Sequence, residues 1–379
     1  MSSSASADAI VLGAGPAGAA AAFQLASAGR RVILLEQQQA PGLANPCGGG
    51  MAASVQRWFP FDLTPAVDQV IRRVRFTWAL EDPVTAELPG DAPFWIVRRR
   101  VLDGFLSARA QEAGAELRCS ATAEAVGREG GLWQVRLAGG ETLRAPALVV
   151  AEGSGSRHAT ALGLGPQRPR YASTISVELD CPVAEPDTAR FEFGLVHHGF
   201  CWAFPRQGGT SIGVGTFIGQ QPADADVVLN ALLPSLGLAA DAGRRRQGRL
   251  RIWDGHHPLH RQGVVVAGDA ASLCDPFLAE GLRPSLMSGC RAGEAVDRWL
   301  AGDGEALAGY SVRMRQDWGE SMAWGKRIAQ VFYRLPRVGY QLGIKRPTAP
   351  QRIAQILSGE MGYGDIAQRV IKRLLFQRG

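Results

Sequence analysis

The chain has 379 residues, of which 46% are apolar and 20% charged, proportions that are ordinary for a globular protein and allow a large buried core. Its six scattered cysteines include no C-x-x-C pair, which argues against a disulfide framework or a structural zinc and favours a reducing, cytoplasmic setting. The net charge of +6 does not indicate a nucleic-acid surface, because Ser311 to Gly379 alone holds thirteen Lys/Arg against four Asp/Glu.

The chain opens with a predicted strand–helix–strand unit. "AIVLGAGPAG" predicts a buried strand entering a glycine-rich turn, "AGAAAAFQLASAG" an alanine-rich helix closed by Gly29, and "RRVILLE" a strand ending at Glu36. The uncharged run from Ala9 to Gly29 is long enough to imitate a transmembrane span. Its glycines fit a nucleotide-binding turn better, so we do not expect it to cross a membrane.

That turn carries a dinucleotide-binding motif. Residues 13–18 match G-x-G-x-x-G between the strand and the helix, and an acid follows at Glu36. Gly13 allows the tight turn, Gly15 lets a pyrophosphate approach the backbone, and Gly18 lets the helix pack closely. The helix N-terminus then faces the phosphates, and Glu36 accepts hydrogen bonds from the ribose hydroxyls.

The middle of the chain alternates short strands with few helices. A loop-rich stretch from Gln37 to Pro60 holds "ANPCGGGMAAS", in which Cys47 directly precedes three glycines. After it we expect strands at "VRFTWAL" and "FWIV", an amphipathic helix from Arg99 to Gly114, a β-meander from Glu116 to Leu143, and an antiparallel sheet from Tyr171 to Phe217.

A second landmark follows at "VVVAGDAA", residues 264–271, which reads as a strand ending in Gly-Asp before a long helix from about Gly281 to Leu300. An Asp at this position can accept hydrogen bonds from the ribityl hydroxyls of a flavin, so the pair of landmarks favours FAD over NAD. No second G-x-G-x-x-G is present, so NADPH or reduced ferredoxin would act as an external electron donor. The rest of the chain is predicted to be helical and Arg-rich.

With these residues in place, the chain resembles the geranylgeranyl reductase family of flavoproteins, which has the p-hydroxybenzoate hydroxylase fold. The resemblance covers roughly residues 7–300 and rests also on "NPCGGG", "RRRVLDGFLSARAQEAGA" and "GFCWAFPRQGGTSIGVG". The segment "RRRVLDGFLSARAQEAGA", which contains the helix predicted from Arg99 to Gly114, is most similar to the corresponding helix of the chlorophyll-pathway reductases. The sequence differs from the family pattern at Ala151-Glu152-Gly153 and at Leu278-Ala279-Glu280-Gly281, where Ala-Asp-Gly and Gly-Glu-Gly are usual.

The resemblance implies an α/β fold with three parts. A Rossmann-like FAD-binding domain of the glutathione reductase/p-hydroxybenzoate hydroxylase type takes residues 1–60, 95–165 and 255–305. An antiparallel β substrate domain takes residues 61–94 and 166–254, and a helical basic lobe takes residues 306–379.

The resemblance also implies a set of site residues and an activity. Trp202, Phe204 and Pro205 would form a wall of an apolar substrate cavity. The activity would be reduction of isoprenoid C=C bonds, as in geranylgeranyl diphosphate, geranylgeranylated chlorophyll, quinone tails or archaeal-type lipids. FAD would be bound by Gly13, Gly15, Ala17, Gly18, Glu36, Cys47, Gly48, Gly50, Arg99, Thr122, Asp269, Gly281 and Leu282.

The reaction needs a proton as well as a hydride from reduced FAD, because an isolated alkene is a poor hydride acceptor. We expect Gly48 to Gly50 to lie along the isoalloxazine ring, with Cys47 beside its reactive edge as the candidate catalytic proton donor. A buried cysteine in a plain turn is the structural alternative.

Other interpretations remain open. The same fold serves FAD monooxygenases and halogenases, and a non-catalytic flavin or isoprenoid carrier is a further alternative. We expect no metal at His256, His257 and His260, which lie on a predicted strand without a carboxylate or cysteine at ligand spacing. At the C-terminus, apolar rows beside basic residues at 366–378 are typical of an interfacial helix, or of a helix docked on the main body, and predict a cytoplasmic protein with peripheral membrane contact.

Overall fold

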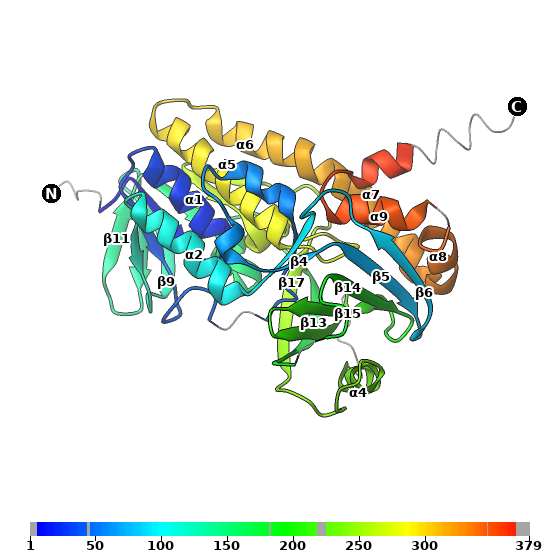
Figure 1. The fold of residues 1–379 in the computed structure, drawn as a ribbon. Coiled ribbons are helices and arrows are strands. Elements are labelled where there is room, and N and C mark those ends of the chain that lie inside the picture. The colour runs from blue at the N-terminus through cyan, green and yellow to red at the C-terminus, as the bar shows by residue number, and fades with distance from the viewer. Residues whose placement is uncertain (1–5, 44–45, 182, 218–224, 347, 369–379) are drawn as a thin grey trace, which may run out of the picture.

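The computed structural model of the chain describes residues 6–43, 46–181, 183–217, 225–346 and 348–368. A mostly parallel sheet near the N-terminus and a larger, mostly antiparallel sheet form its two main layers, and helices follow at the C-terminal end (Figure 1). The fold class predicted from the sequence is confirmed.

The parallel sheet has the strand order β18-β19-β12-β1-β2-β8, in which the edge strand β18 runs antiparallel. Its strands are β1 (Ala9–Leu12), β2 (Val32–Leu35), β8 (Glu116–Arg118), β12 (Ala147–Val150), β18 (His260–Arg261) and β19 (Val264–Val266). The strands β1, β2 and β12 are wholly buried and apolar, because both faces of the sheet are covered.

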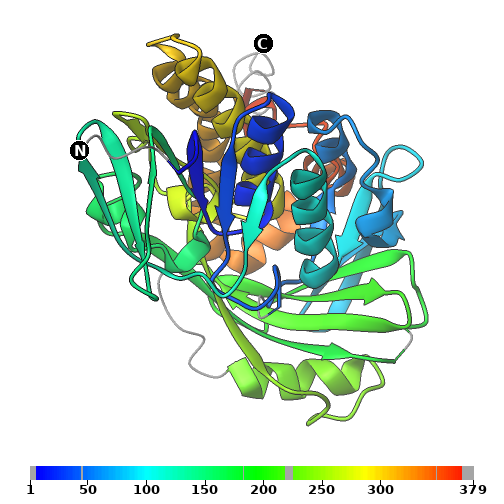
Figure 2. The same cartoon turned by 90° about the vertical axis from the view of Figure 1, so that its left-hand side faces the viewer.

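Helices cover one face of this sheet and a small sheet covers the other, as Figure 2 shows. The helices are α1 (Pro16–Ser27), α2 (Arg99–Glu112) and α5 (Leu282–Leu300). The small sheet has β9 (Ala123–Glu129), β10 (Leu132–Leu137) and β11 (Thr142–Ala145), and it confirms the predicted meander except at its start, where Glu116–Arg118 forms β8 of the parallel sheet. Together these layers bury the strands that end at the predicted nucleotide-binding turn.

The uncharged run near the N-terminus forms β1, the glycine-rich turn and the buried helix α1. This helix packs against α5, where a Cβ atom on Gly289 would lie 2.2 Å from the carbonyl oxygen of Ala17. As predicted, Gly29 follows the helix in the left-handed conformation, with φ of +81°. In the part of the chain that the structure describes, no helix is both long enough and apolar enough to span a bilayer.

The larger sheet has seven strands in the order β17-β13-β16-β15-β14-β5-β6. They are β5 (Arg73–Trp78), β6 (Glu81–Glu87), β13 (Arg170–Leu179), β14 (Thr188–Phe193), β15 (Gly199–Arg206), β16 (Gly209–Thr216) and β17 (Arg246–Ile252). The helix α4 (Ala225–Ser235) covers the outer face, where Leu229 and Leu233 belong to the same apolar cluster as Cys201 and Val214 (Figure 2). The opposite face is therefore available for a site.

A further sheet has three strands, in the order β3 (Gly50–Ala52), β7 (Phe94–Val97) and β4 (Val67–Ile71). It pairs segments from both sides of the predicted domain boundaries at residues 60 and 94. The two predicted domains thus share a sheet, and their division stays a prediction.

The C-terminal helices are α6 (Ala306–Met314), a π-helical turn at Arg315–Gly319, α7 (Glu320–Arg334), α8 (Pro336–Gly343) and α9 (Ala349–Leu357). Buried aromatic donors connect these helices to the rest of the protein. Tyr310 Oη donates to the carbonyl of Val266 in β19 at 2.8 Å, and Trp318 Nε1 donates to the Leu273 carbonyl at 2.7 Å. Of the predicted interfacial helix, Ile366 is half-buried, and residues 369–378 lie outside the described residues.

The remaining elements are short. They are α3 (His158–Ala161) and 3₁₀ turns at Ala53–Trp58, Thr64–Ala66, Gly153–Gly155 and Gly268–Ala271. The strand predicted for the histidine cluster is wrong in part, because His256 and His257 lie in a loop and only His260 lies in β18. Three closely spaced turn residues, Asp254, Gly255 and Pro258, interrupt the strand there.

Candidate active site

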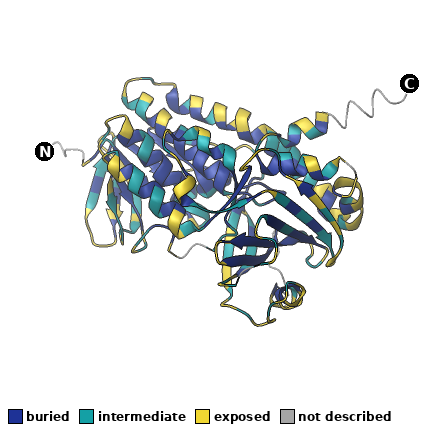
Figure 3. Cartoon of the chain, in the orientation of Figure 1, coloured by how far each residue is buried: buried dark blue, intermediate teal, exposed yellow. Residues whose placement is uncertain are grey.

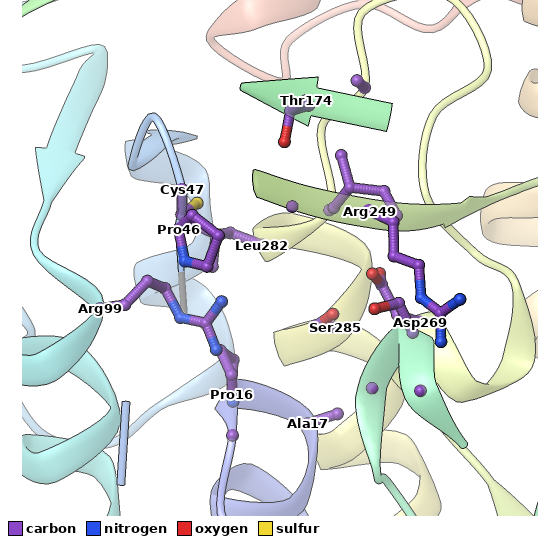
Figure 4. Close-up of a pocket in the computed structure, with 18 of the residues that line it drawn as sticks. Pro16, Ala17, Pro46, Cys47, Arg99, Thr174, Arg249, Asp269, Leu282 and Ser285 are labelled. Carbon is purple, nitrogen blue, oxygen red and sulfur yellow. The ribbon is translucent and has the colours of Figure 1, made fainter. Parts of the chain in front are cut away.

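A cavity of about 710 Å³ lies between the parallel sheet, the inner face of the seven-stranded sheet and the start of α5. Figure 4 shows Arg99, Pro46 and Cys47 on one side of it and Asp269 and Arg249 on the other. Twelve of the thirteen predicted cofactor-binding residues line this cavity. Gly18 is the exception.

The glycine-rich turn has the geometry that a pyrophosphate needs. Gly13 has φ of +94°, and a Cβ atom on Gly18 would lie 1.8 Å from the Gly13 carbonyl oxygen. Gly18 is therefore a packing residue beneath the turn. A Cβ atom on Gly15 would meet nothing closer than Arg99 Nη2, at 3.7 Å, so the backbone of Gly15 is open to the cavity.

Arg99 carries a fixed positive charge beside this turn. Its guanidinium forms a bidentate ion pair with Asp103, one helical turn along α2, with Nε–Oδ1 and Nη2–Oδ2 distances of 2.9 and 2.7 Å. Although burial opposes the charge, the Asp103 carboxylate raises the pKa of Arg99 above its ordinary value. The guanidinium thus stays charged and points toward the turn at Pro16 (Figure 4).

Glu36 lies at the end of β2, where a ribose would be bound. Its carboxylate accepts hydrogen bonds from the backbone N–H groups of Ala14, at 3.1 Å, and Gln38, at 2.9 Å. These bonds hold the carboxylate against the glycine-rich turn. Thr122 lines the same end of the cavity.

Asp269 lies across the cavity, in the 3₁₀ turn that follows β19. Burial raises the pKa of Asp269 to about 6, opposed by the nearby Arg99 charge. A Cβ atom on Gly281 would lie 3.4 Å from Asp269 Oδ1, so the carboxylate faces the start of α5. A buried acceptor at this position fits the hydroxyl donors of a ribityl chain.

The Cys-bearing loop packs on aromatic rings. A Cβ atom on Gly48 would lie 3.0 Å from Trp202 Nε1, and one on Gly50 would lie 2.6 Å from the Phe94 ring. The thiol of Cys47 accepts the Gly49 N–H at 3.3 Å, and the Cys47 carbonyl accepts from Arg206 at 3.0 Å. The glycines are needed because side chains there would strike the cavity wall.

Aromatic side chains form the wall of the cavity opposite the parallel sheet. Trp202 and Phe204 line it as predicted, but Pro205 does not, because alternate residues of β15 face opposite sides of the sheet. Sequence reasoning missed four further lining rings: Phe94, Phe191, Phe200 and Phe217. The i, i+2, i+4 spacing of Phe200, Trp202 and Phe204 was the available signal.

Sequence reasoning also missed an acidic residue that lines the cavity, Glu280. Glu280 lines the cavity with only 6% of its side chain exposed, and it forms an ion pair of 2.7 Å with Arg283. Its Oε1 atom is buried without a hydrogen-bond partner among the described residues. Burial raises the pKa of Glu280 to about 7, and Arg283 opposes the shift.

A tight turn presents Glu280 to the cavity. The carboxylate of Asp275 accepts the N–H groups of Phe277 and Leu278, at 2.7 and 3.0 Å, and the hydroxyl of Tyr363, at 2.7 Å. The turn closes where the Asp275 N–H donates to the Glu280 carbonyl at 3.0 Å. Ala279, just before Glu280, has φ of +54°, a conformation that L-residues with a side chain rarely adopt.

The predicted histidine cluster is dispersed in the structure. His257 pairs with Asp254 at 2.7 Å and His260 with Ser311 at 2.7 Å, whereas His256 packs on Trp253. Across the described ranges, no group of three His, Cys, Asp or Glu residues is arranged to hold a metal ion.

Comparison with known proteins places this site in a family. The sequence matches two family models, both described as FAD dependent oxidoreductase, over residues 8–161 and 92–299. It is 30% identical to geranylgeranyl diphosphate reductase of Rhodobacter capsulatus, over 77% of this chain and 75% of that protein. It is 28% identical to digeranylgeranylglycerophospholipid reductase 2 of Methanopyrus kandleri, over 86% of both chains.

Solved structures show the same fold. A geranylgeranyl bacteriochlorophyll reductase-like protein of Thermoplasma acidophilum superimposes with a TM-score of 0.78, at 20% identity and over 93% of this chain and 91% of that one. A flavin-dependent brominase superimposes with a TM-score of 0.71, at 18% identity and over 97% and 98% of the chains. The fold alone therefore does not separate reductases from halogenases, but the sequence matches do, and the chain belongs to the geranylgeranyl reductase family of FAD-dependent oxidoreductases.

Proposed function

We propose that this protein is an FAD-dependent reductase that saturates C=C bonds of a geranylgeranyl-type isoprenoid chain. One observation carries the proposal: a single cavity joins the FAD-binding landmarks to a wall of aromatic rings. An apolar chain bound along that wall would lie beside the flavin.

The described residues fit FAD. The open backbone at Gly15 and the charge of Arg99 would hold the pyrophosphate, Glu36 the ribose, and Asp269 the ribityl hydroxyls. The helix α5 begins at Leu282, where its N-terminus would face the flavin ring. Reduced FAD supplies the hydride for the reaction.

The protein contributes an environment for the alkene. Proton transfer to a trisubstituted C=C bond generates positive charge on the neighbouring carbon, and aromatic faces stabilise a nearby cation. The rings of Phe191, Trp202 and Phe204 line the cavity and are almost completely buried, which keeps bulk water from that charge.

For the proton, Glu280 has better chemistry than Cys47. With a pKa of about 7, its carboxyl group is about half protonated at neutral pH and is a much stronger acid than an ordinary thiol. General acids work best when their pKa lies near the working pH. We propose that Glu280 donates the proton and that Cys47 shapes the loop.

The electrons would come from outside this chain. Its single G-x-G-x-x-G supports NADPH or reduced ferredoxin as a visiting donor rather than a resident second cofactor. We also infer a cytoplasmic location with peripheral contact to the membrane in which long isoprenoid chains reside.

The test uses FAD-loaded protein that has been chemically reduced without oxygen. Adding a geranylgeranyl substrate should reoxidise the flavin and yield a product with two more hydrogen atoms per reduced bond, seen by mass spectrometry. Flavin that is reoxidised only by oxygen, with hydroxylated or halogenated product, would support the monooxygenase or halogenase alternative. Bound flavin that neither reaction reoxidises would indicate a carrier.

A further inference from the structure

The far end of the C-terminal helices carries an exposed apolar cluster, here called the α7–α8 corner. It consists of Val331 in the last turn of α7, Leu335 at the junction, and Val338 and Leu342 in α8. Their exposed fractions are 71, 59, 50 and 54%, and the corner is at the right in the view of Figure 3. Of the nine large apolar residues that are exposed in the described ranges, these four lie within twelve residues of one another.

The fold holds these side chains outward. Phe332 and Tyr340 face inward, where Phe332 packs 5.4 Å from Phe193 and Tyr340 donates a hydrogen bond to the Asp82 carbonyl at 2.7 Å. A Cβ atom on Gly339 would lie 2.7 Å from Phe332, so α8 is held closely against α7. The corner is therefore a fixed part of the surface, and its exposed apolar side chains have no place to turn inward.

The helices that form the corner are basic, and Asp82 of β6, which lies beside α8, is paired with Lys345. From Ser321 to Gly359 the sequence has seven Lys/Arg and no Asp/Glu. Among them, Arg327, Arg334, Arg337 and Arg346 are exposed. An apolar centre ringed by arginines matches the surface of a bilayer with anionic lipids, where apolar side chains enter the headgroup boundary and cationic ones bind the lipid phosphates.

We propose that the α7–α8 corner docks this protein on an anionic lipid bilayer. The same charge disfavours other occupants. A two-fold contact with a second copy would bring the basic rims together. The C-terminal residues 369–379 contain four Lys/Arg and no acid, so they would also be repelled. An acidic electron-transfer protein would match the charge but would leave the apolar centre unexplained.

The position of the corner suits delivery of a chain to the cavity, an argument that rests on the proposed function. The inner face of α7 carries Tyr333, whose ring lies 5.9 Å from that of Phe217. Phe217 lines the cavity. The bilayer-facing surface and the aromatic wall thus lie on opposite sides of one helix, which places the proposed docking surface near the site.

The experiment is flotation of the FAD-loaded protein with vesicles of phosphatidylcholine, with and without phosphatidylglycerol. Binding is expected only with the anionic lipid, and it should weaken as salt is raised. The double variants Leu335→Asp/Leu342→Asp and Arg334→Gln/Arg337→Gln should each bind at least about tenfold more weakly. Val227→Asp on α4, where Val227 is 64% exposed, and Arg244→Gln in the exposed loop after it are matched controls that should bind like the wild type.

Several results would overturn the proposal. The first is vesicle binding by the corner variants that equals that of the wild type, and the second is binding that is abolished by deleting residues 369–379 alone. The third is a dimer, seen by light scattering, that the corner variants dissociate. The fourth is that the corner variants lose only the reduction by ferredoxin. Activity on a short, detergent-dispersed substrate distinguishes failure of the docking proposal from failure of the proposed function. The corner variants should keep that activity, whereas a protein inactive on any isoprenoid but still bound to vesicles would refute the function and leave the docking surface intact.

Discussion

The guanidinium of Arg99 and the carboxylate of Asp103 form a bidentate ion pair in the wall of the cavity, and Asp103 is completely buried. The pair fixes the direction of the guanidinium, whose Nη2 would lie 3.7 Å from a Cβ atom on Gly15. The position of the positive charge beside the glycine-rich turn thus depends on an acid that does not itself line the cavity.

Asp103→Asn should therefore weaken FAD binding. The amide keeps the shape of the side chain but removes one acceptor and the negative charge, so the guanidinium is less firmly oriented. We expect the dissociation constant for FAD, measured by quenching of flavin fluorescence, to rise about tenfold, the equivalent of one charge-assisted hydrogen bond.

Glu112→Gln is the matched control, because Glu112 pairs with Arg109 on the exposed side of the same helix. Exposed pairs contribute little, so this variant should keep the wild-type affinity and lose less than about 0.5 kcal/mol of stability. Equal effects of the two substitutions would show that α2 as a whole, and not the buried pair, controls FAD binding.

Gly18→Ala should prevent a correctly packed nucleotide site. The added Cβ would lie 1.8 Å from the Gly13 carbonyl oxygen, so α1 would have to move away from the turn. Overpacking of this kind costs about 1–3 kcal/mol in the free energy of unfolding, and FAD binding should fall with it. Gly104→Ala on α2 is the control, since nothing lies within 4 Å of that position. It should raise stability slightly, because alanine favours helix, and thermal unfolding compares the two.

Local patterns predicted the elements that carry the nucleotide site, whereas long-range packing decided the rest. The turn at Gly13 and the acid at Glu36 could be predicted because the residues that define them lie within about thirty positions of each other. Asp269 could be predicted because it lies at the end of a strand, so the pattern that identifies it is also local. Phe94 begins β7 and Phe217 follows the end of β16, and nothing near them in the sequence shows that they face one cavity.

The same limit explains Pro205 and Glu280. The position of Pro205 was predicted from a motif, but which face of β15 points inward depends on the pairing of the sheet. Glu280 lies in a segment that departs from the family pattern, and its raised pKa arises from burial and from the nearby Asp275. Asp275 is in turn hydrogen-bonded by Tyr363, a residue distant in sequence.

Trp202→Leu should weaken substrate binding more than it weakens FAD binding. The substitution opens space beside Gly48 and removes a ring from the aromatic wall. We expect KM for a geranylgeranyl substrate to rise about tenfold, which corresponds to loss of one aromatic contact, with FAD retained. Cys201→Ala on the same strand faces the α4 side, so it should lower stability slightly and leave KM unchanged. A rise in KM for both variants would argue that β15 is merely distorted.

Glu280→Gln should change how stability depends on pH. Burial raises the pKa of Glu280 to about 7 from an ordinary value near 4.5. Between these two pH values the folded protein therefore holds a proton that the unfolded chain has lost, and the free energy of unfolding falls as the pH rises through that window. Glutamine cannot lose a proton, so the decrease in stability from about pH 5 to 8 should shrink by roughly 2 kcal/mol, measured by urea unfolding of FAD-free and FAD-loaded protein.

The same variant tests the role of Glu280 as proton donor. With wild-type protein, the rate at which an alkene reoxidises the reduced flavin should fall above about pH 7, where the carboxyl group loses its proton. Glu280→Gln should lower that rate about a hundredfold and abolish the pH dependence, because the amide has no acidic proton to give. Cys47→Ser is the comparison, and it should retain both the rate within a few-fold and the wild-type pH profile. The serine hydroxyl can accept the Gly49 N–H in place of the thiol, and the contact with Arg206 is made by the backbone carbonyl. If Cys47→Ser instead removes the activity and Glu280→Gln keeps the wild-type profile, the thiol is the acid and the carboxyl group only stabilises the turn.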